Sequence, residues 1–388
     1  MNADSSLPVT MKRARAYRSW HTRQALPLLL ALICCIPWSP LRSPLSEMSG
    51  RPSDPSTLAD RLLARMTLQQ KIGQMVMAPA DSVVATGRLG GAILFGSDVV
   101  SPGQGRARIA ALQQAQAIPL LVAADQEGGD TSTMSSGGGV PAELSEAQYG
   151  AIGSTTRVYQ DALTAGRALR ALGITMDLAP VLDVLTDPGS PMASRSYGAD
   201  PARVTALGLA ALRGYHDAGI AATAKHFLGL GASDDDAHVT LPTDTRTLPQ
   251  LESAELVPMR AAIRAGVDAL MVTHVALPAL DPSGTPASLS RPVITGFIRG
   301  RLGYQGVIIT DSLAMGGLGP HIASIQVAAL RAVQAGADMV LIAADVPTIR
   351  ITLTVLDEAA FAGRIPLSAI NASVRRILIL KARLGLLH

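Results

Sequence analysis

The stretch "GVIITD" (Gly306 to Asp311) is a short apolar run that ends in a carboxylate. Seven other short, largely apolar runs are separated from it and from one another by longer segments with helical patterns: "QMVMAP" (Gln74 to Pro79), "GAILF" (Gly91 to Phe95), "PLLVAAD" (Pro119 to Asp125), "TMDLAPVLD" (Thr175 to Asp183), "AATAKHF" (Ala221 to Phe227), "ALMVTHV" (Ala269 to Val275) and "MVLIA" (Met339 to Ala343). Runs that are apolar throughout are typical of parallel strands covered on both faces. Eight such strands alternating with helices predict an α/β fold, a single-domain (β/α)8 TIM barrel, with a doubly wound open sheet as the alternative.

Polar side chains are concentrated at the ends of these runs. Six of them follow five of the predicted strands: Asp125, Asp183, Lys225, His226, His274 and Asp311. In a barrel the C-terminal ends of the strands lie on one face, where catalysis takes place. Because only 16% of the chain is charged, this concentration indicates an active site on that face.

The charge balance argues against a nucleic-acid partner. The 388 residues are 48% hydrophobic, ample for a buried core, and carry a net charge of +3. The first 48 residues hold six basic residues and two acidic ones, so the rest of the chain is slightly negative. That part lacks the basic excess that nucleic-acid binding requires.

The N-terminal segment (residues 1–48) is predicted to be a signal peptide or a membrane anchor. Its basic residues precede "ALPLLLALICCIPW" (Ala25 to Trp38), which has the length of a signal-peptide apolar region and is short for a bilayer span. Lipid attachment at Cys34 or Cys35 and a buried helix are competing interpretations of the same run. We therefore expect an exported protein of the cell envelope or extracellular space, with a Pro/Ser-rich linker at residues 49–56 and a folded domain at 57–388.

Metal and serine chemistry find little support in the sequence. His226, His238 and His274 do not include the His-x-His spacing of barrel metallohydrolases, and Lys225 beside His226 would oppose a metal cation. The chain also has no G-x-S-x-G nucleophile motif. We expect no metal and no cofactor, although an envelope metallohydrolase remains a hypothesis to test.

Glycoside cleavage requires a carboxylate that attacks the anomeric carbon and a second group that transfers a proton. Asp311 suits the first role, but an aspartate after a strand is also a common helix N-cap. His238 suits the second role, with Asp236 placed to orient its ring, but "DDDAH" (Asp234 to His238) also has the composition of a solvated acidic loop. The residues alone do not decide between these roles.

A series of motifs in this chain resembles the family 3 glycoside hydrolases, specifically the single-domain β-N-acetylglucosaminidases. They extend in the family's order over nearly the whole predicted domain: "MTLQQKIGQMVM" (from Met66), "AADQEGG" (from Ala123), "LAPVLDV" (from Leu178), "SRSYG" (from Ser194), "AKHFLGLG" (from Ala224), "DAH" (from Asp236), "PASLSRPVITGFIRGRLGYQGVIITDSLAM" (from Pro286), "AGADMVLI" (from Ala335) and "RRILILKARLGL" (from Arg375). The resemblance implies a (β/α)8 barrel, in agreement with the eight predicted strands.

The resemblance also implies roles for single residues. Asp311 matches the nucleophile that forms a covalent glycosyl-enzyme, His238 the acid/base residue, and Asp236 its carboxylate partner. The residues that match those holding the sugar hydroxyls are Asp125, Arg195, Lys225 and His226. The implied activity is retaining removal of terminal β-linked N-acetylglucosamine by a monomeric enzyme.

The implied substrates are small glycans or peptidoglycan fragments, because the chain does not continue into the C-terminal domain of the β-glucosidase branch and has only 3% aromatic residues. A β-glucosidase or phosphorylase variant and a non-catalytic sugar-binding protein are the competing hypotheses.

The chain departs from the family pattern at several positions. Asp130 and Thr133 replace two arginines, Leu228 and Leu230 replace a proline and a basic residue, and Ala237 replaces a serine. Because the matched catalytic residues are all present, we expect an active enzyme with altered substrate preference.

Overall fold

The computed structural model describes residues 54–388. The predicted signal or anchor segment, its two cysteines and most of the predicted linker lie outside the described residues. Helix α1 (Pro55–Leu63) begins inside the predicted linker, with the Asp54 carboxylate accepting a hydrogen bond from the Thr57 N–H at its first turn. Between residues 54 and 388, no helix combines the length and apolarity that a bilayer span requires.

Eight parallel strands form a barrel in the spatial order β10-β1-β2-β3-β6-β7-β8-β9. Each lies in one of the eight predicted runs: β1 (Val76–Pro79), β2 (Gly91–Ile93), β3 (Leu121–Ala124), β6 (Met176–Asp177), β7 (Ala221–Phe227), β8 (Ala269–Val272), β9 (Val307–Thr310) and β10 (Val340–Leu341). The ring closes where Ile309 pairs with Met339, and the Thr310 N–H donates to the Met339 carbonyl at 3.1 Å. The predicted TIM barrel is confirmed, and the open doubly wound sheet is wrong.

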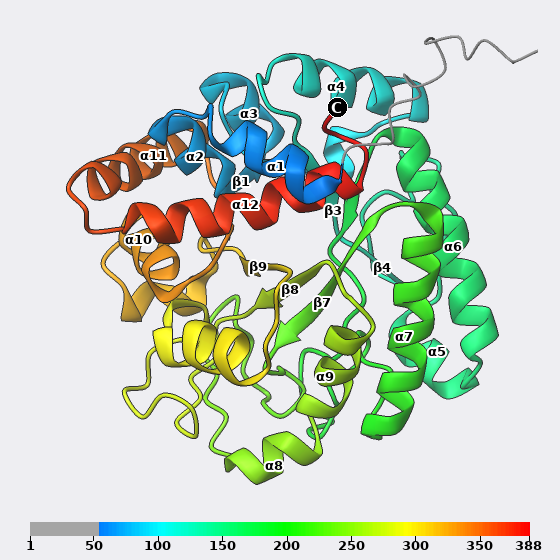
Figure 1. The fold of residues 1–388 in the computed structure, drawn as a ribbon. Helices are drawn as coiled ribbons and strands as arrows, with labels where there is room; N and C mark the ends of the chain where they lie inside the picture. The colour runs from blue at the N-terminus through cyan, green and yellow to red at the C-terminus, as the bar shows by residue number, and fades with distance from the viewer. Residues whose placement is uncertain (1–53) are drawn as a thin grey trace, which may run out of the picture. The chain divides into compact units, whose positions relative to one another are not determined.

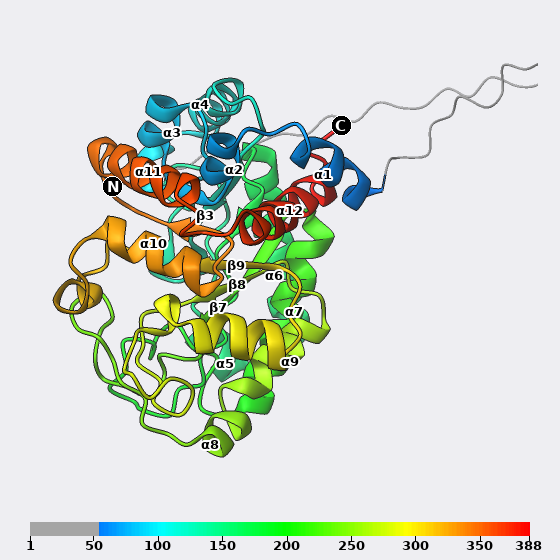
Figure 2. The same cartoon turned by 60° about the vertical axis from the view of Figure 1, so that its left-hand side comes forward.

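Helices surround the barrel, and Figures 1 and 2 show α6 beside α7 and α1 lying along α12. Their bounds are α2 (Leu68–Gln74), α3 (Ala80–Thr86), α4 (Pro102–Gln114), α5 (Glu146–Ile152), α6 (Thr155–Leu172), α7 (Pro201–Ala218), α8 (Leu248–Ser253), α9 (Leu256–Arg264), α10 (Ile325–Ala335), α11 (Val346–Phe361) and α12 (Leu367–Arg383). A π-helical segment at Pro292–Arg301 connects β8 to β9. The apolar side chains of strands and helices form one continuous buried core.

Local sequence signals position β7, the strand that carries Lys225 and His226. The preceding helix α7 begins at Pro201, where the Asp200 carboxylate accepts the Ala202 N–H at 2.9 Å. It ends before Gly219, whose φ of 79° lies in the left-handed region that favours glycine. The chain therefore turns sharply from the outer helix into a strand whose residues are all buried.

Two elements differ from the expectation drawn from the sequence. The run "TMDLAPVLD" forms a regular strand over only two residues, Met176 and Asp177. Its later part stays beside β7 through backbone hydrogen bonds, such as the one from the Thr223 N–H to the Ala179 carbonyl at 2.9 Å, although Pro180 itself has no N–H to donate. A small antiparallel hairpin, β4 (Gln126–Gly128) with β5 (Thr131–Ser132), follows β3 and was not predicted. Its strands are too short to give an alternating pattern.

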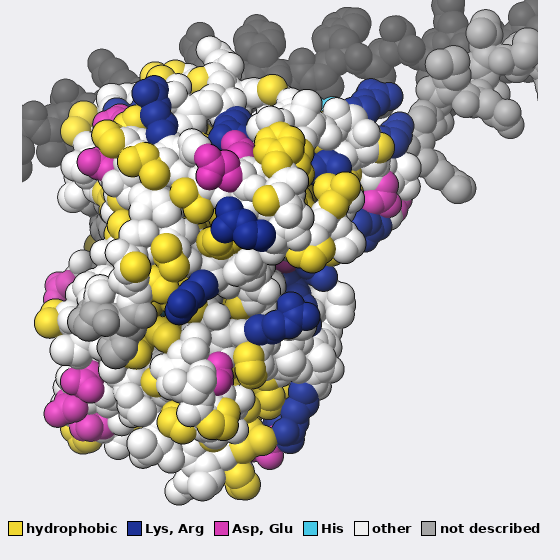
Figure 3. All heavy atoms as spheres, turned by 90° about the vertical axis from the view of Figure 1, so that its left-hand side faces the viewer, with side chains coloured by type: hydrophobic (Ala, Val, Ile, Leu, Met, Phe, Trp, Pro, Cys, Tyr) yellow, Lys and Arg dark blue, Asp and Glu magenta, His cyan; other side chains and the backbone are white. Residues whose placement is uncertain are grey.

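Charged side chains of both signs occupy the face shown in Figure 3. Lysine and arginine side chains are interspersed there with acidic, hydrophobic and uncharged ones. The charge on this face is therefore mixed, in keeping with the near-neutral composition of this part of the chain.

Candidate active site

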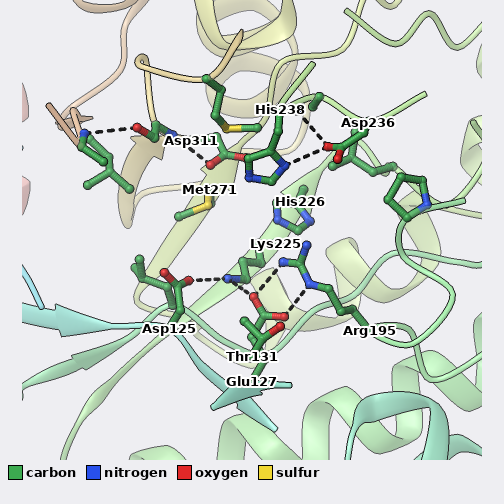
Figure 4. A pocket seen from close by; sticks show the side chains of 18 of the residues that line it. Asp125, Glu127, Thr131, Arg195, Lys225, His226, Asp236, His238, Met271 and Asp311 are labelled. Atoms are coloured by element: carbon green, nitrogen blue, oxygen red, sulfur yellow. Dashed lines mark hydrogen bonds and ion pairs between the residues drawn. The ribbon is translucent and has the colours of Figure 1, made fainter. Parts of the chain in front are cut away.

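A cavity of about 540 Å³ opens at the C-terminal ends of the barrel strands. The seven residues to which the resemblance assigned catalytic or sugar-binding roles all line it: Asp125, Arg195, Lys225, His226, Asp236, His238 and Asp311. Figure 4 shows them facing one another across the cavity. The fold therefore brings together residues from five separate segments of the chain.

The floor of the cavity is a network of two cations and two carboxylates. Lys225 Nζ contacts Asp125 Oδ1 at 2.8 Å and also pairs with Glu127. Burial lowers the pKa of Lys225, but the two carboxylates outweigh that effect and raise it overall. Lys225 is therefore a fixed cation although its side chain is only 2% exposed.

Glu127 is the residue of this network that the sequence analysis missed. Its carboxylate receives two hydrogen bonds from Arg195, Nε and Nη2 each at 2.7 Å. Burial raises the pKa of Glu127, but Lys225 and Arg195 outweigh burial and lower it to about 2. Glu127 lies on β4 of the unpredicted hairpin, so it did not fall at the end of a predicted strand. The only signal was its place inside the motif "AADQEGG".

Only part of the Arg195 guanidinium is available to a ligand in the cavity. Its Nε and Nη2 are both bound to Glu127, so among the described residues Nη1 is the terminal nitrogen left for a ligand. The predicted contact between Arg195 and a sugar hydroxyl is thereby limited to part of the guanidinium.

His226 is oriented by a buried carboxylate. Its Nδ1 lies 2.7 Å from Asp183 Oδ2, and Asp183 Oδ1 also accepts the Leu230 N–H at 2.9 Å. Because a ring nitrogen bonded to a carboxylate carries the proton, His226 has Nε2 to offer to the cavity. Asp183, which the sequence placed at a strand end, is fully buried and supports the site from behind.

Asp311 follows β9 directly and is held by two hydrogen bonds. Thr273 Oγ1 donates to Asp311 Oδ2 at 2.9 Å, and the Ser312 N–H donates to Oδ1 at 2.8 Å. Burial raises the pKa of Asp311, but His226, His274 and these donors outweigh it and hold the pKa below the usual value. Asp311 is therefore an anion facing the cavity.

His274 lies beneath Asp311 and does not line the cavity. Its Nε2–H donates to the Ser312 carbonyl at 2.9 Å, and its Nδ1 lies 2.7 Å from the Ser288 hydroxyl. Burial lowers the pKa of His274, although the Asp311 carboxylate and the Ser312 carbonyl oppose this effect. The strand-end histidine of the sequence analysis thus supports the Asp311 loop.

His238 and Asp236 lie on the loop after β7. His238 Nδ1 is 2.8 Å from Asp236 Oδ1, which also accepts the His238 backbone N–H at 2.8 Å. The His238 side chain is 65% exposed, and Figure 4 shows it over the cavity between Asp311 and Asp236. Burial raises the pKa of Asp236, but the hydrogen bonds from His238 outweigh it and lower the pKa overall.

The neighbouring acidic residues Asp234 and Asp235 are exposed, as expected of solvated loop charges. Asp235 also lines the rim of the cavity and accepts a hydrogen bond from Thr240 Oγ1 at 3.3 Å. No group of three or more His, Cys, Asp or Glu side chains within residues 54–388 is arranged to hold a metal ion.

Comparison with known proteins identifies the family that has this architecture. The sequence profile of the glycosyl hydrolase family 3 N-terminal domain matches residues 67–380. The chain belongs to glycosyl hydrolase family 3. The resemblance drawn from the motifs is thereby confirmed.

Two similar proteins differ in how much of their length this chain spans. Beta-hexosaminidase LpqI of Mycobacterium tuberculosis is 34% identical over 360 residues, which cover 89% of each chain. The beta-N-acetylglucosaminidase/beta-glucosidase of Cellulomonas fimi is 33% identical over 290 residues, which cover 72% of this chain but 50% of that protein. The chain therefore spans half of one relative and most of the other.

A solved family 3 structure has the same fold. The beta-N-acetylglucosaminidase from Paenibacillus sp. str. FPU-7 superimposes with a TM-score of 0.80 at 40% sequence identity. The match covers 83% of this chain and 63% of that one.

The departures from the family 3 pattern have clear places in the structure. Leu228 is fully buried in the core, and Leu230 forms part of the cavity wall, so this wall is apolar where the family pattern has a basic residue. Asp130 is exposed, whereas Thr133 Oγ1 donates to the Asp125 carbonyl at 2.7 Å. Thr133 therefore helps to hold the backbone that carries Asp125.

Proposed function

We propose that the protein is a retaining exo-β-N-acetylglucosaminidase that acts through a covalent glycosyl-aspartate. The observation that carries the proposal is the pairing of an anionic Asp311 in the cavity with an exposed His238 above it, oriented by Asp236. These are the nucleophile and the proton-transfer group that retention requires. The names of two similar proteins, a beta-hexosaminidase and a beta-N-acetylglucosaminidase, support the choice of N-acetylglucosamine.

In the first step, a carboxylate oxygen of Asp311 attacks the anomeric carbon while the bond to the leaving oxygen breaks. Protonated His238 gives its Nε2 proton to that oxygen, and Asp236 stabilises the imidazolium beforehand through Nδ1. In the second step, neutral His238 accepts a proton from water, and the water oxygen displaces Asp311 from the anomeric carbon. Asp311 is an anion again and His238 a cation, so charge and protons balance over the cycle.

The floor supplies the sugar-binding groups in this proposal. Asp125 and Arg195 offer an acceptor and a donor to sugar hydroxyls, and His226 offers Nε2. Lys225 and Glu127 hold these groups in place. The proposed substrates are small glycans or peptidoglycan fragments outside the cytoplasm, processed by a monomer without a cofactor.

The test is turnover of a panel of nitrophenyl glycosides, the β-N-acetylglucosaminide, β-glucoside and β-xyloside, with and without phosphate. We expect release of nitrophenol from the N-acetylglucosaminide, a drop of at least about 10³-fold in Asp311→Ala, and labelling of Asp311 by an activated 2-fluoro sugar. Asp235→Asn, which changes a rim carboxylate of the same cavity, is the matched control and should retain most activity.

Different outcomes would favour the competing hypotheses. Preference for the glucoside, or sugar phosphate as the product, would support the β-glucosidase or phosphorylase variant. Calorimetric binding of N-acetylglucosamine without turnover of any glycoside would contradict catalysis and support a sugar-binding protein. Activity lost with a chelator and restored by one divalent metal would support the metallohydrolase hypothesis.

A further inference from the structure

The backbone on either side of His238 is docked on two glycines of another loop. The Gly316 N–H donates to the His238 carbonyl at 3.0 Å, and the Gly317 N–H donates to the Ala237 carbonyl at 3.1 Å. Ala237 is buried at this contact, whereas the neighbouring Val239 is 69% exposed. The turn that carries His238 is thus held from one side.

These two hydrogen bonds attach the ten-residue segment 232–241 to the rest of the described structure. Asp236 ties the turn together internally, since its carbonyl accepts the N–H groups of Val239 and Thr240. Among the hydrogen bonds of the described residues, those that join residues 232–241 to any other segment are the two from Gly316 and Gly317. The position of His238 over the cavity therefore depends on this contact.

The contact also requires that both residues lack a side chain. A Cβ on Gly316 would lie 2.5 Å from the His238 carbonyl oxygen, and one on Gly317 would lie 2.4 Å from the carbonyl oxygens of both Ala237 and Thr240. Neither glycine has a φ in the left-handed region, so a substitution would meet a clash with the turn but no backbone strain. The clash falls on the segment that carries His238.

The loop that holds the two glycines also carries Asp311 and is itself fixed. The Asp311 N–H donates to the Val272 carbonyl at 2.9 Å, and the Leu313 N–H donates to the Leu341 carbonyl at 2.9 Å. The strands on both sides therefore anchor it.

We propose that Gly316 and Gly317 are positioning residues that set His238 in register with Asp311. The inference rests on the proposed function and adds to it how the proton donor is held. Because one loop carries both the nucleophile and the docking glycines, the separation of the two catalytic groups is built into that loop.

The test compares Gly317→Ala with His238→Ala on two N-acetylglucosaminides, one with a nitrophenyl and one with a more acidic dinitrophenyl leaving group. A dinitrophenolate leaves without a proton, so loss of the donor spares its release. We expect kcat/KM for the nitrophenyl substrate to fall by about 10²-fold in both variants, with a much smaller fall for the dinitrophenyl substrate. Azide attacks the glycosyl-enzyme without needing a general base. It should therefore raise kcat for the dinitrophenyl substrate in both variants.

Gly319→Ala is the matched control, because a Cβ there would meet no described atom within 4 Å. It should behave as wild type. If Gly317→Ala also behaves as wild type, or loses activity equally on both substrates without azide rescue, the positioning role is overturned. Should Gly317→Ala fail to fold, Gly316→Ala, whose Cβ meets one carbonyl oxygen instead of two, gives the same test.

The proposed function fails separately. It fails if the wild type turns over neither substrate, or if His238→Ala leaves both rates unchanged. If wild type and His238→Ala behave as proposed, but the glycine variants do not show the same pattern of activity loss and azide rescue as His238→Ala, only the positioning role is contradicted.

Discussion

Asp311 is kept anionic by specific donors despite its burial, and Thr273 is the one that mutation can remove cleanly. Thr273→Val deletes the 2.9 Å hydrogen bond to Asp311 Oδ2 while keeping the shape of the side chain. The pKa of Asp311 should therefore rise. When the pH is lowered, the variant should lose activity at a higher pH than the wild type does. We expect the acid limb of the kcat/KM profile to move up by about half to one pH unit.

Thr273→Ser keeps the hydroxyl and is the control for this prediction. It should restore the wild-type acid limb, while the alkaline limb stays in place in both variants. An acid limb that does not move in Thr273→Val would show that Thr273 does not stabilise the Asp311 anion.

Glu127 is the anchor of both floor cations, and its loss should disable sugar binding. Glu127→Gln removes the negative charge that Lys225 and Arg195 share in a buried setting. Breaking a buried ion pair costs about 3–5 kcal/mol, and relaxation of the site offsets part of that cost. We therefore expect kcat/KM for the N-acetylglucosaminide to fall by on the order of 10²-fold.

Glu143 offers a matched control for Glu127→Gln. Burial raises the pKa of Glu143 to about 8, so its side chain is mostly protonated at neutral pH, and it accepts a hydrogen bond from Gln126 at 3.2 Å. Glu143→Gln replaces one neutral group by another and should leave kcat/KM nearly unchanged at pH 7. Equal losses in the two variants would contradict a specific role for the Glu127 charge.

The residues that the sequence could identify are those set at the ends of strands. Asp125, Lys225, His226 and Asp311 follow apolar runs, and a barrel places all such ends on one face. Arg195 lies far from any strand end in the sequence, so only the resemblance to a family pointed to it. His238 and Asp236 were candidates from their residue types, but the resemblance was needed to choose a catalytic pair over a solvated acidic loop. The docking glycines carry no signal in the sequence, because their role depends on which loop packs against them.

At the scale of elements, α12 carries a lysine in the core. Lys381 is fully buried, its Nζ donates to Gln74 Oε1 of α2, and burial lowers its pKa to about 7. Its pKa in the unfolded chain is about 10.4. Between these two values the unfolded state binds more protons than the folded state, so stability should rise with pH.

Lys381→Met should remove this pH dependence. The wild-type free energy of unfolding, measured by urea denaturation, should gain on the order of 2–3 kcal/mol relative to that of Lys381→Met between about pH 7 and pH 9.5. Lys71→Met, which removes a half-buried lysine from α2, should keep the wild-type rise. Parallel curves for wild type and Lys381→Met would show that Lys381 stays charged in the folded state.

The elements themselves were predictable from runs of apolar residues. Each of the eight predicted runs contains a barrel strand, although the run that includes Pro180 forms a regular strand over only two residues. The β4 and β5 hairpin was missed because strands of two or three residues have no measurable period. The shape of so short a segment is decided by tertiary contacts, which the sequence alone does not reveal. One such contact is the 2.7 Å hydrogen bond from Thr133 Oγ1 to the Asp125 carbonyl.

At the scale of the whole molecule, the first and last helices of the described residues pack against each other. Helix α1 packs along α12, with Ala59 fully buried and Leu62 and Leu63 against the core. An ion pair joins Arg375 Nε to Asp60 Oδ1 at 2.6 Å. Both partners of this pair are about half exposed, so it contributes little, and the apolar contact is the larger part of the stabilisation.

Two shortened chains separate the contribution of α1 from that of the preceding residues. A chain that begins at Pro52 keeps α1 and its Asp54 cap, so we expect its kcat/KM and its melting temperature to match those of the chain beginning at Met1. A chain that begins at Thr67 lacks α1 and should melt at least about 5 °C lower, because the apolar surface of α12 is then exposed. Asp60→Asn, which breaks only the ion pair, should shift the melting temperature by less than about 2 °C.

Since no described residue of α1 lines the cavity, whatever fraction of the shorter chain folds should retain the wild-type KM. Equal melting temperatures for the chains beginning at Pro52 and Thr67 would contradict a structural role for α1.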